Sequence, residues 1–220
     1  YKMGLSDDKI SVYKSYTKGR PVPGAAGDQA TVPTFSDNLH FLFDYQLGFM
    51  YWRYFMWNFA GRQNDFQAQK GDPTRGNWLS GIKFIDEARL GTQDNQPDFM
   101  ANNKGRNVYY MLPLLLGLLG LAYQLLRDKY NFTVVMLLFF FTGIAIVLYL
   151  NQSPNEPRER DYAYAGSFYA FAIWIGLGVV AIYKLLKRFT PKTVAAGVAS
   201  IASLFVPVIM CAQNWDDHDR

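Results

Sequence analysis

The chain has 220 residues, of which 50% are hydrophobic and 17% aromatic, and its formal net charge at pH 7 is +4. The charge is modest and the basic residues form no stripe with interleaved aromatics, so we expect no nucleic-acid partner. The single cysteine, Cys211, lies inside an apolar run. This excludes an internal disulfide and a cysteine-based metal site, and it predicts a buried, inert thiol.

The composition changes near residue 107. Most of the Gly, Asp, Asn and Gln residues precede it, and Leu, Ile, Val, Phe and Ala dominate residues 108–213. The change predicts a water-facing segment over 1–107 followed by a membrane region. The chain opens without a signal peptide and stops soon after an apolar run, so we expect an internal fragment in which 214–220 begin a further extracytoplasmic part.

In chain order, residues 18–34 are rich in Pro and Gly without periodicity, which predicts a loop. A helix over about 37–60 follows, which Ser36 or Asp37 can cap and Gly61 can end. Aromatic residues dominate this helix, but charged residues interrupt them. The pattern favours an interfacial helix, or one packed against the spans, and leaves a fifth membrane crossing open.

The polar composition of residues 61–107 predicts a long loop with one short amphipathic helix near 79–90. A loop of this length is usually functional or disordered. Its aromatic residues, Trp78, Phe84 and Phe99, argue for at least partial packing.

Four apolar stretches are long enough to cross a bilayer, for which about 20 residues are needed. They cover 108–126, 132–150, 163–186 and 193–213. The predicted fold class is therefore an all-α membrane protein, with four transmembrane helices behind a partly irregular extracytoplasmic segment that carries the aromatic helix. Small residues at helix-face spacings predict close packing between spans, among them Gly117, Gly120, Gly176 and Gly178.

The short loops predict the orientation. Basic residues prevail between the first two stretches and between the last two, and such loops stay in the cytoplasm. Residues 1–107, the 151–161 loop and the C-terminal end are then periplasmic if the membrane is a bacterial inner membrane. Aromatic residues near this outer boundary predict an interfacial belt: Tyr109, Tyr110, Tyr149, Tyr162, Tyr164, Tyr169 and Trp215.

The 151–161 loop concentrates charge between two apolar stretches. In an extended segment, Arg158 and Arg160 share one face, and Glu159 and Asp161 share the other. The guanidinium fork suits phosphate oxygens, and the loop is expected at the level of lipid phosphates. The alternative is a self-neutralising loop of surface ion pairs.

The end of the chain groups Asp216, Asp217, His218 and Asp219. Such groups can bind a divalent cation or transfer protons, but acids after a span are more often a solvated cap. We therefore assign no metal site and keep these residues as a polar cluster whose metal binding stays open. No catalytic motif of defined spacing occurs elsewhere in the chain.

Four segments resemble a known family: YQLGFMYWRYFMWNFAGRQND, NNKGRNVYYMLPLLLGLLG, LYLNQSPNEPRERDYAYAGSFYAFAIWIGLG and NWDDHDR. They resemble large multi-span proteins of Bacteroidetes once known only as a domain of unknown function. That family is grouped with glycosyltransferases that include the vertebrate transmembrane O-mannosyltransferase of plexin-type receptors. The resemblance covers about 34–220, and PRERDYAYAGSFYAF is its most specific part.

The resemblance implies a GT-C-type membrane glycosyltransferase. Such enzymes pass a sugar from a polyprenyl-phosphate donor to an extracytoplasmic acceptor, here expected to be a protein, and no cofactor is required. The catalytic carboxylate of such enzymes usually lies in the first extracytoplasmic loop, which we expect outside this fragment, so no catalytic residue is assigned.

Within this chain, we expect Arg158 and Arg160 to bind the donor phosphate. Glu159 and Asp161 would hold the arginines in position, and Tyr162 and Tyr164 would line the lipid or sugar. The competing hypothesis is a non-enzymatic scaffold or envelope-assembly component whose aromatic helix docks a partner. A transporter is disfavoured, because the four stretches carry almost no ionisable group at mid-membrane.

Overall fold

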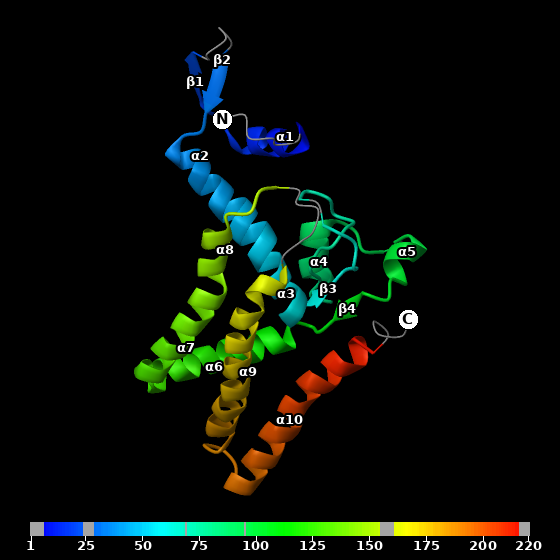
Figure 1. Ribbon diagram of the computed structural model, residues 1–220. Helices are drawn as coiled ribbons and strands as arrows, with labels where there is room; N and C mark the ends of the chain where they lie inside the picture. Colours follow the sequence, from blue (N-terminus) through cyan, green and yellow to red (C-terminus); the bar gives the residue numbers. More distant parts are fainter. Residues whose placement is uncertain (1–6, 24–28, 69, 95, 155–160, 216–220) are drawn as a thin grey trace.

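The computed structural model describes residues 7–23, 29–68, 70–94, 96–154 and 161–215 (Figure 1). The N-terminal part contains α1 (Asp7–Tyr16), β1 (Arg20–Pro23), β2 (Gln29–Val32), α2 (Phe35–His40), the π-helix η1 (Phe41–Trp52) and α3 (Arg53–Phe59). A polar cap follows, with β3 (Gly61–Arg62), α4 (Lys83–Leu90), α5 (Asp98–Ala101) and β4 (Asn107–Val108). The apolar region contains α6 (Leu112–Arg127), α7 (Lys129–Thr142), α8 (Ile144–Leu150), the 3₁₀ turn η2 (Asp161–Tyr164), α9 (Ala165–Leu186) and α10 (Lys192–Gln213).

Part of the segment predicted as a loop over 18–34 is a β-hairpin. Strands β1 and β2 pair antiparallel, with Arg20 opposite Val32. In a two-stranded ribbon each strand has an open edge, so the missing N–H groups of Pro21 and Pro23 can face that edge. This is why a proline-rich stretch still forms a strand here.

The predicted aromatic helix is present as one continuous helix over 35–59, made of α2, η1 and α3. Its N-cap is Thr34, and not Ser36 or Asp37 as predicted. The Thr34 N–H donates to Asp37 Oδ2 at 2.8 Å, and the Asp37 N–H donates to Thr34 Oγ1 at 3.3 Å, which is a capping box. The hydrogen bond from the Thr34 backbone holds the pKa of the Asp37 carboxyl below its usual range. The helix ends just before Gly61, as predicted.

The aromatic helix packs against the apolar region. Phe55, Met56 and Phe59 are buried with Leu114 of α6 and with Phe171 and Trp174 of α9 in one core cluster. The ring centroids of Phe59 and Phe171 are 4.6 Å apart. Of the alternatives that the sequence left open, the structure therefore shows packing against the apolar helices.

The first predicted transmembrane stretch, 108–126, is shorter as a helix than expected. Val108 belongs to β4, and the Tyr109 N–H donates to the Ala60 carbonyl at 2.9 Å. Tyr110 and Met111 then adopt positive φ angles of 53° and 56°, so the helix begins only at Leu112. The first residues of the predicted span are therefore not helical, because their backbone pairs with β3 and with Ala60 instead.

Three helical segments in the described chain are long and apolar enough to cross a membrane. They are Lys129–Leu150, Tyr162–Leu186 and Lys192–Gln213, which correspond to the second, third and fourth predicted stretches. The remaining stretch forms the 16-residue α6. The described chain is thus a mostly helical protein with three candidate spans rather than the four that the sequence predicts.

Glycines bring α6 and α9 into backbone contact. A Cβ atom at Gly120 would overlap the carbonyl oxygen of Trp174, and one at Gly178 would overlap that of Leu116. Trp174 Nε1 also donates to the buried Gln124 Oε1 at 2.7 Å across this crossing. Gly120 and Gly178 thus have the predicted packing role, whereas Gly176 has open space beside it.

The polar cap is ordered by buried side chains. Asp86 of α4 accepts hydrogen bonds from the Ser80 and Gly81 N–H groups, both at 2.8 Å, and so folds residues 80–82 into a turn. The predicted helix near 79–90 consequently begins later, at Lys83. Arg53 of the aromatic helix reaches into the cap, where its guanidinium donates to the Gly76 carbonyl at 3.1 Å.

The predicted interfacial belt of aromatic residues and the predicted buried cysteine both need correction. Tyr109 and Tyr164 are buried at 4% and 1% exposure, whereas the other five belt residues are exposed. Cys211 is exposed on α10 rather than buried. An apolar run predicts a lipid environment, but it does not show which face of the helix packs inward.

Gly120→Ala tests the α6–α9 crossing against Gly176→Ala as a matched control. Both substitutions improve helix propensity by up to about 1 kcal/mol, but only the first inserts a methyl group between two backbones. We expect Gly120→Ala to lower the free energy of unfolding by about 1–3 kcal/mol and Gly176→Ala to leave it unchanged or slightly raised. Tryptophan fluorescence during SDS unfolding in mixed micelles measures both. Equal stability of the two variants would contradict the crossing.

Candidate functional site

The charged loop is the segment between α8 and α9, and α8 ends beside the aromatic helix at Asn151 (Figure 1). Arg158, Glu159 and Arg160 lie outside the described residues, and of Asp161 only the backbone, in η2, is described. Their predicted roles therefore remain predictions. What the structure describes is how the two flanks of this loop are held.

The first flank is held by two polar contacts from distant segments. Gln46 Nε2, in the aromatic helix, donates to Asn151 Oδ1 at 2.8 Å. Lys9 Nζ, in α1, donates to Ser153 Oγ at 3.0 Å. Asn151 itself ends α8 in a left-handed conformation with φ of 41°, which turns the chain out of the helix. The aromatic helix and α1 thus fix where the loop leaves α8.

The second flank is held by a buried chain of hydroxyl groups. Tyr51 donates through its hydroxyl to Ser167 Oγ at 3.0 Å, and Ser167 Oγ donates to the Tyr164 carbonyl at 2.7 Å. The Tyr164 hydroxyl donates to Gln152 Oε1 at 3.4 Å and so links the two flanks. Within the described ranges, Gln152 Nε2 is buried and has no acceptor. The base of the loop is therefore an ordered polar layer with one unused amide donor.

The two tyrosines of the predicted donor site lie in different surroundings. Tyr162 is exposed, whereas Tyr164 is buried with Tyr51 and Val147. The rings of Tyr51 and Tyr164 pack edge to face, with centroids 5.6 Å apart. Tyr164 is therefore part of the buried layer under the second flank of the loop, whereas the Tyr162 side chain faces outward.

A further cluster lies in the N-terminal half of the aromatic helix, around Asp44. Lys70 of the cap forms an ion pair with Asp44 and donates to the Tyr16 hydroxyl. Its ammonium also lies 4.5 Å from the centroid of the Tyr16 ring. Burial lowers the pKa of Lys70, and burial together with Tyr45 raises the pKa of Tyr16 to about 12.

Sequence reasoning missed this cluster. Asp44 stands out as an acid among aromatic residues, but nothing local pairs it with Lys70, which is 26 positions away. The pairing arises because α1 and the polar cap both fold back against the aromatic helix.

The terminal cluster Asp216–Asp219 also lies outside the described residues. The helix that leads to it is anchored on the polar cap: Asn214 Nδ2 donates to the Tyr109 hydroxyl at 2.7 Å, and Asn107 Nδ2 donates to Asn214 Oδ1 at 2.9 Å. In the part of the chain that the structure describes, no group of three or more His, Cys, Asp or Glu side chains could hold a metal ion.

Gln46→Leu tests whether the aromatic helix holds the charged loop. The substitution leaves the Asn151 Oδ1 without its donor, a loss of about 1 kcal/mol, so local opening should become about fivefold more frequent. We expect tryptic cleavage after Arg158 and Arg160 to accelerate by this factor relative to cleavage after Arg75, as measured by mass spectrometry. Gln93→Leu is the control, because the hydrogen bonds of the Gln93 amide to described residues go to Gly91 and Gln96, far from the charged loop in sequence. Equal acceleration in both variants would contradict the anchoring.

Comparison with known proteins gives no relative from which a function could be transferred: no family model, no curated protein and no solved structure matches this chain.

Proposed function

We propose that this chain is part of a polytopic membrane glycosyltransferase that moves a sugar from a polyprenyl-phosphate donor to an extracytoplasmic acceptor, most simply a protein. The observation that carries the proposal is the polar layer beneath the charged loop. Both flanks of the loop are tied to buried polar groups, Gln46 on one side and the Tyr51–Ser167 pair on the other. A loop stabilised by surface ion pairs alone would not need such a buried polar layer beneath it.

The proposal requires the charged loop and the basic ends of the helices to lie on opposite sides of the membrane. Gly117, near the start of α6, lies beside Phe171 near the start of α9, and Leu126 and Leu185 at the C-terminal ends of the two helices line one cavity. The two helices are therefore parallel, and their basic C-terminal ends lie together. By the preference of basic loops for the cytoplasm, these ends are cytoplasmic, and the charged loop and polar cap are periplasmic in a bacterial inner membrane.

In this topology α6 completes a fourth crossing. Its 16 residues give a length of about 24 Å, shorter than a hydrocarbon core of about 30 Å. Residues 109–111 precede it without helical geometry, and the Tyr109 N–H donates to the carbonyl of Ala60 at the end of the aromatic helix. Non-helical backbone at this depth is tolerated where protein covers it.

The proposed chemistry assigns binding to this chain and proton transfer to another part of a longer protein. Arg158 and Arg160 bind the donor phosphate through charge-assisted hydrogen bonds, and Glu159 and Asp161 orient them. Exposed Tyr162 lies beside them along the chain, where its ring can meet the prenyl chain or the sugar. The carboxylate that activates the acceptor hydroxyl lies outside residues 1–220.

The packing of the aromatic helix weakens the scaffold alternative. A docking helix must present its apolar face, but Tyr45, Met50, Tyr51, Phe55 and Phe59 are already buried within this chain. Phe35, Phe43 and Trp52 are the aromatic residues of this helix that stay well exposed. A partner could therefore reach only a small part of its aromatic surface.

The experiment is a transfer assay on the longer protein in detergent, with radiolabelled polyprenyl-phosphate sugars and periplasmic acceptor proteins. The variant is Arg158→Ala/Arg160→Ala. Each charge-assisted hydrogen bond contributes about 1.5–3 kcal/mol, so we expect the double variant to lose transfer by at least about 100-fold. Arg20→Ala/Arg75→Ala removes the same charge from the same side and should retain transfer.

Two outcomes would overturn the proposal. Undiminished transfer in the Arg158→Ala/Arg160→Ala variant would remove the charged loop from the donor site. No transfer with any donor, from protein shown to be folded, would favour the scaffold and leave the loop as surface ion pairs.

A further inference from the structure

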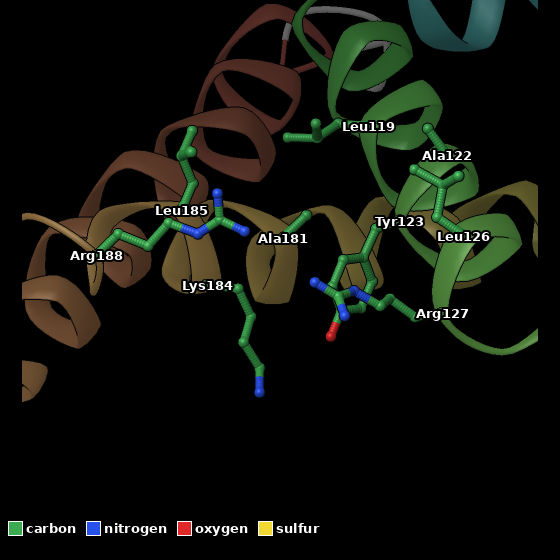
Figure 2. Close-up of a pocket in the computed structure, with 9 residues that line it drawn as sticks. All are labelled: Leu119, Ala122, Tyr123, Leu126, Arg127, Ala181, Lys184, Leu185 and Arg188. Carbon is green, nitrogen blue, oxygen red and sulfur yellow. The ribbon is translucent and has the colours of Figure 1, made fainter.

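A cavity of about 270 Å³ opens between the C-terminal ends of α6 and α9 (Figure 2). The charged loop joins α9 at the opposite end, near Asp161. The cavity is therefore separate from the site of the proposed function. Its lining combines an apolar wall with a basic side, which we call the mouth.

The apolar wall comes from both helices. Leu119, Ala122 and Leu126 of α6 face Ala181 and Leu185 of α9. Leu126 and Leu185 are more than half exposed, at 79% and 55%. Exposed leucines beside a span are expected to meet lipid acyl chains, so an acyl chain is the natural occupant of this wall.

Three cations surround the mouth: Arg127, Lys184 and Arg188. In Figure 2 the guanidinium groups of Arg127 and Arg188 lie on either side of Ala181, and the Lys184 side chain extends below them. Among the residues that the structure describes, no carboxylate forms an ion pair with any of the three. A cationic mouth without a protein counter-ion calls for an external anion.

The neighbouring loop adds to this positive charge. Lys184 is the main cause that holds the pKa of Lys187 below its usual value, and Lys192 contributes in the same direction. A cation in the last turn of a helix stabilises that helix end through the backbone dipoles. This explains one cation on each helix, but it does not explain why cations from two helices converge on one cavity.

We propose that this cavity binds an anionic phospholipid of the surrounding leaflet. The phosphate lies between Arg127 and Arg188, whose planar forks match phosphate oxygens. One acyl chain lies along the leucine and alanine wall. A free phosphate would use only the mouth, whereas a phospholipid uses both the mouth and the apolar wall. Basic pockets between membrane helices bind anionic head groups in this manner, and the choline group of a zwitterionic lipid would meet three like charges.

The test titrates this 220-residue chain in dodecyl maltoside with dioleoyl phosphatidylglycerol or with dioleoyl phosphatidylcholine, and native mass spectrometry counts the bound lipids. We expect phosphatidylglycerol to bind at least about tenfold more tightly. Arg127→Gln/Arg188→Gln should abolish this preference. Lys129→Gln/Lys192→Gln removes the same charge from the same end outside the cavity lining and should keep it. A third variant, Ala122→Phe, fills the cavity without changing charge and should lower phosphatidylglycerol binding severalfold.

Equal binding of the two lipids by the unmodified chain would overturn the proposal. An equal loss of preference in the two double variants would show a diffuse surface charge instead of a site. If 10 mM inorganic phosphate displaced the lipid, the mouth alone would be the binding site and the lipid assignment would be wrong. If Arg127→Gln/Arg188→Gln did not fold, judged by size exclusion and circular dichroism, unchanged lipid binding by Ala122→Phe would still reject the cavity.

Discussion

The close approach of α6 and α9 is the constraint on which the rest of the structure depends. Gly120 and Gly178 have no side chains to separate the two backbones, and the Trp174 indole is fixed by its hydrogen bond to Gln124. Trp174 also belongs to the core cluster that receives the end of the aromatic helix. In lipid, where apolar burial does not drive helices together, such contacts and buried hydrogen bonds supply the association.

The α6–α9 pair positions a different feature at each of its two ends. Towards the polar cap, Phe55 and Phe59 of the aromatic helix rest on α9, and the same helix supplies Gln46 and Tyr51 to the base of the charged loop. Towards the other end, α6 and α9 continue side by side and leave the cavity with its basic mouth. One pair of parallel helices thus positions a polar layer at one end and a cationic cavity at the other.

The two proposals concern different ends of this helix pair, and they use arginine in the same chemical sense. In each, guanidinium groups meet a phosphate that carries a long apolar chain. They differ in what surrounds the arginines. The charged loop supplies its own acids, Glu159 and Asp161, whereas Arg127, Lys184 and Arg188 have no carboxylate partner among the described residues. The first arrangement suits a substrate that must leave, and the second suits a resident lipid.

The amino-acid sequence by itself determined the helical class, three of the spans, the aromatic helix and the close contacts of Gly117, Gly120 and Gly178, but not of Gly176. Apolar length and small-residue spacing are local properties. It could not place Tyr164, which belongs to an interfacial tyrosine pattern but is buried beneath Tyr51. It also could not show that the first helix begins late. Tyr109 stays outside this helix because its N–H donates to the carbonyl of Ala60, almost fifty positions earlier. The Gln46–Asn151 and Lys70–Asp44 contacts and the basic cavity were decided by tertiary structure alone, since each joins segments that no local pattern relates.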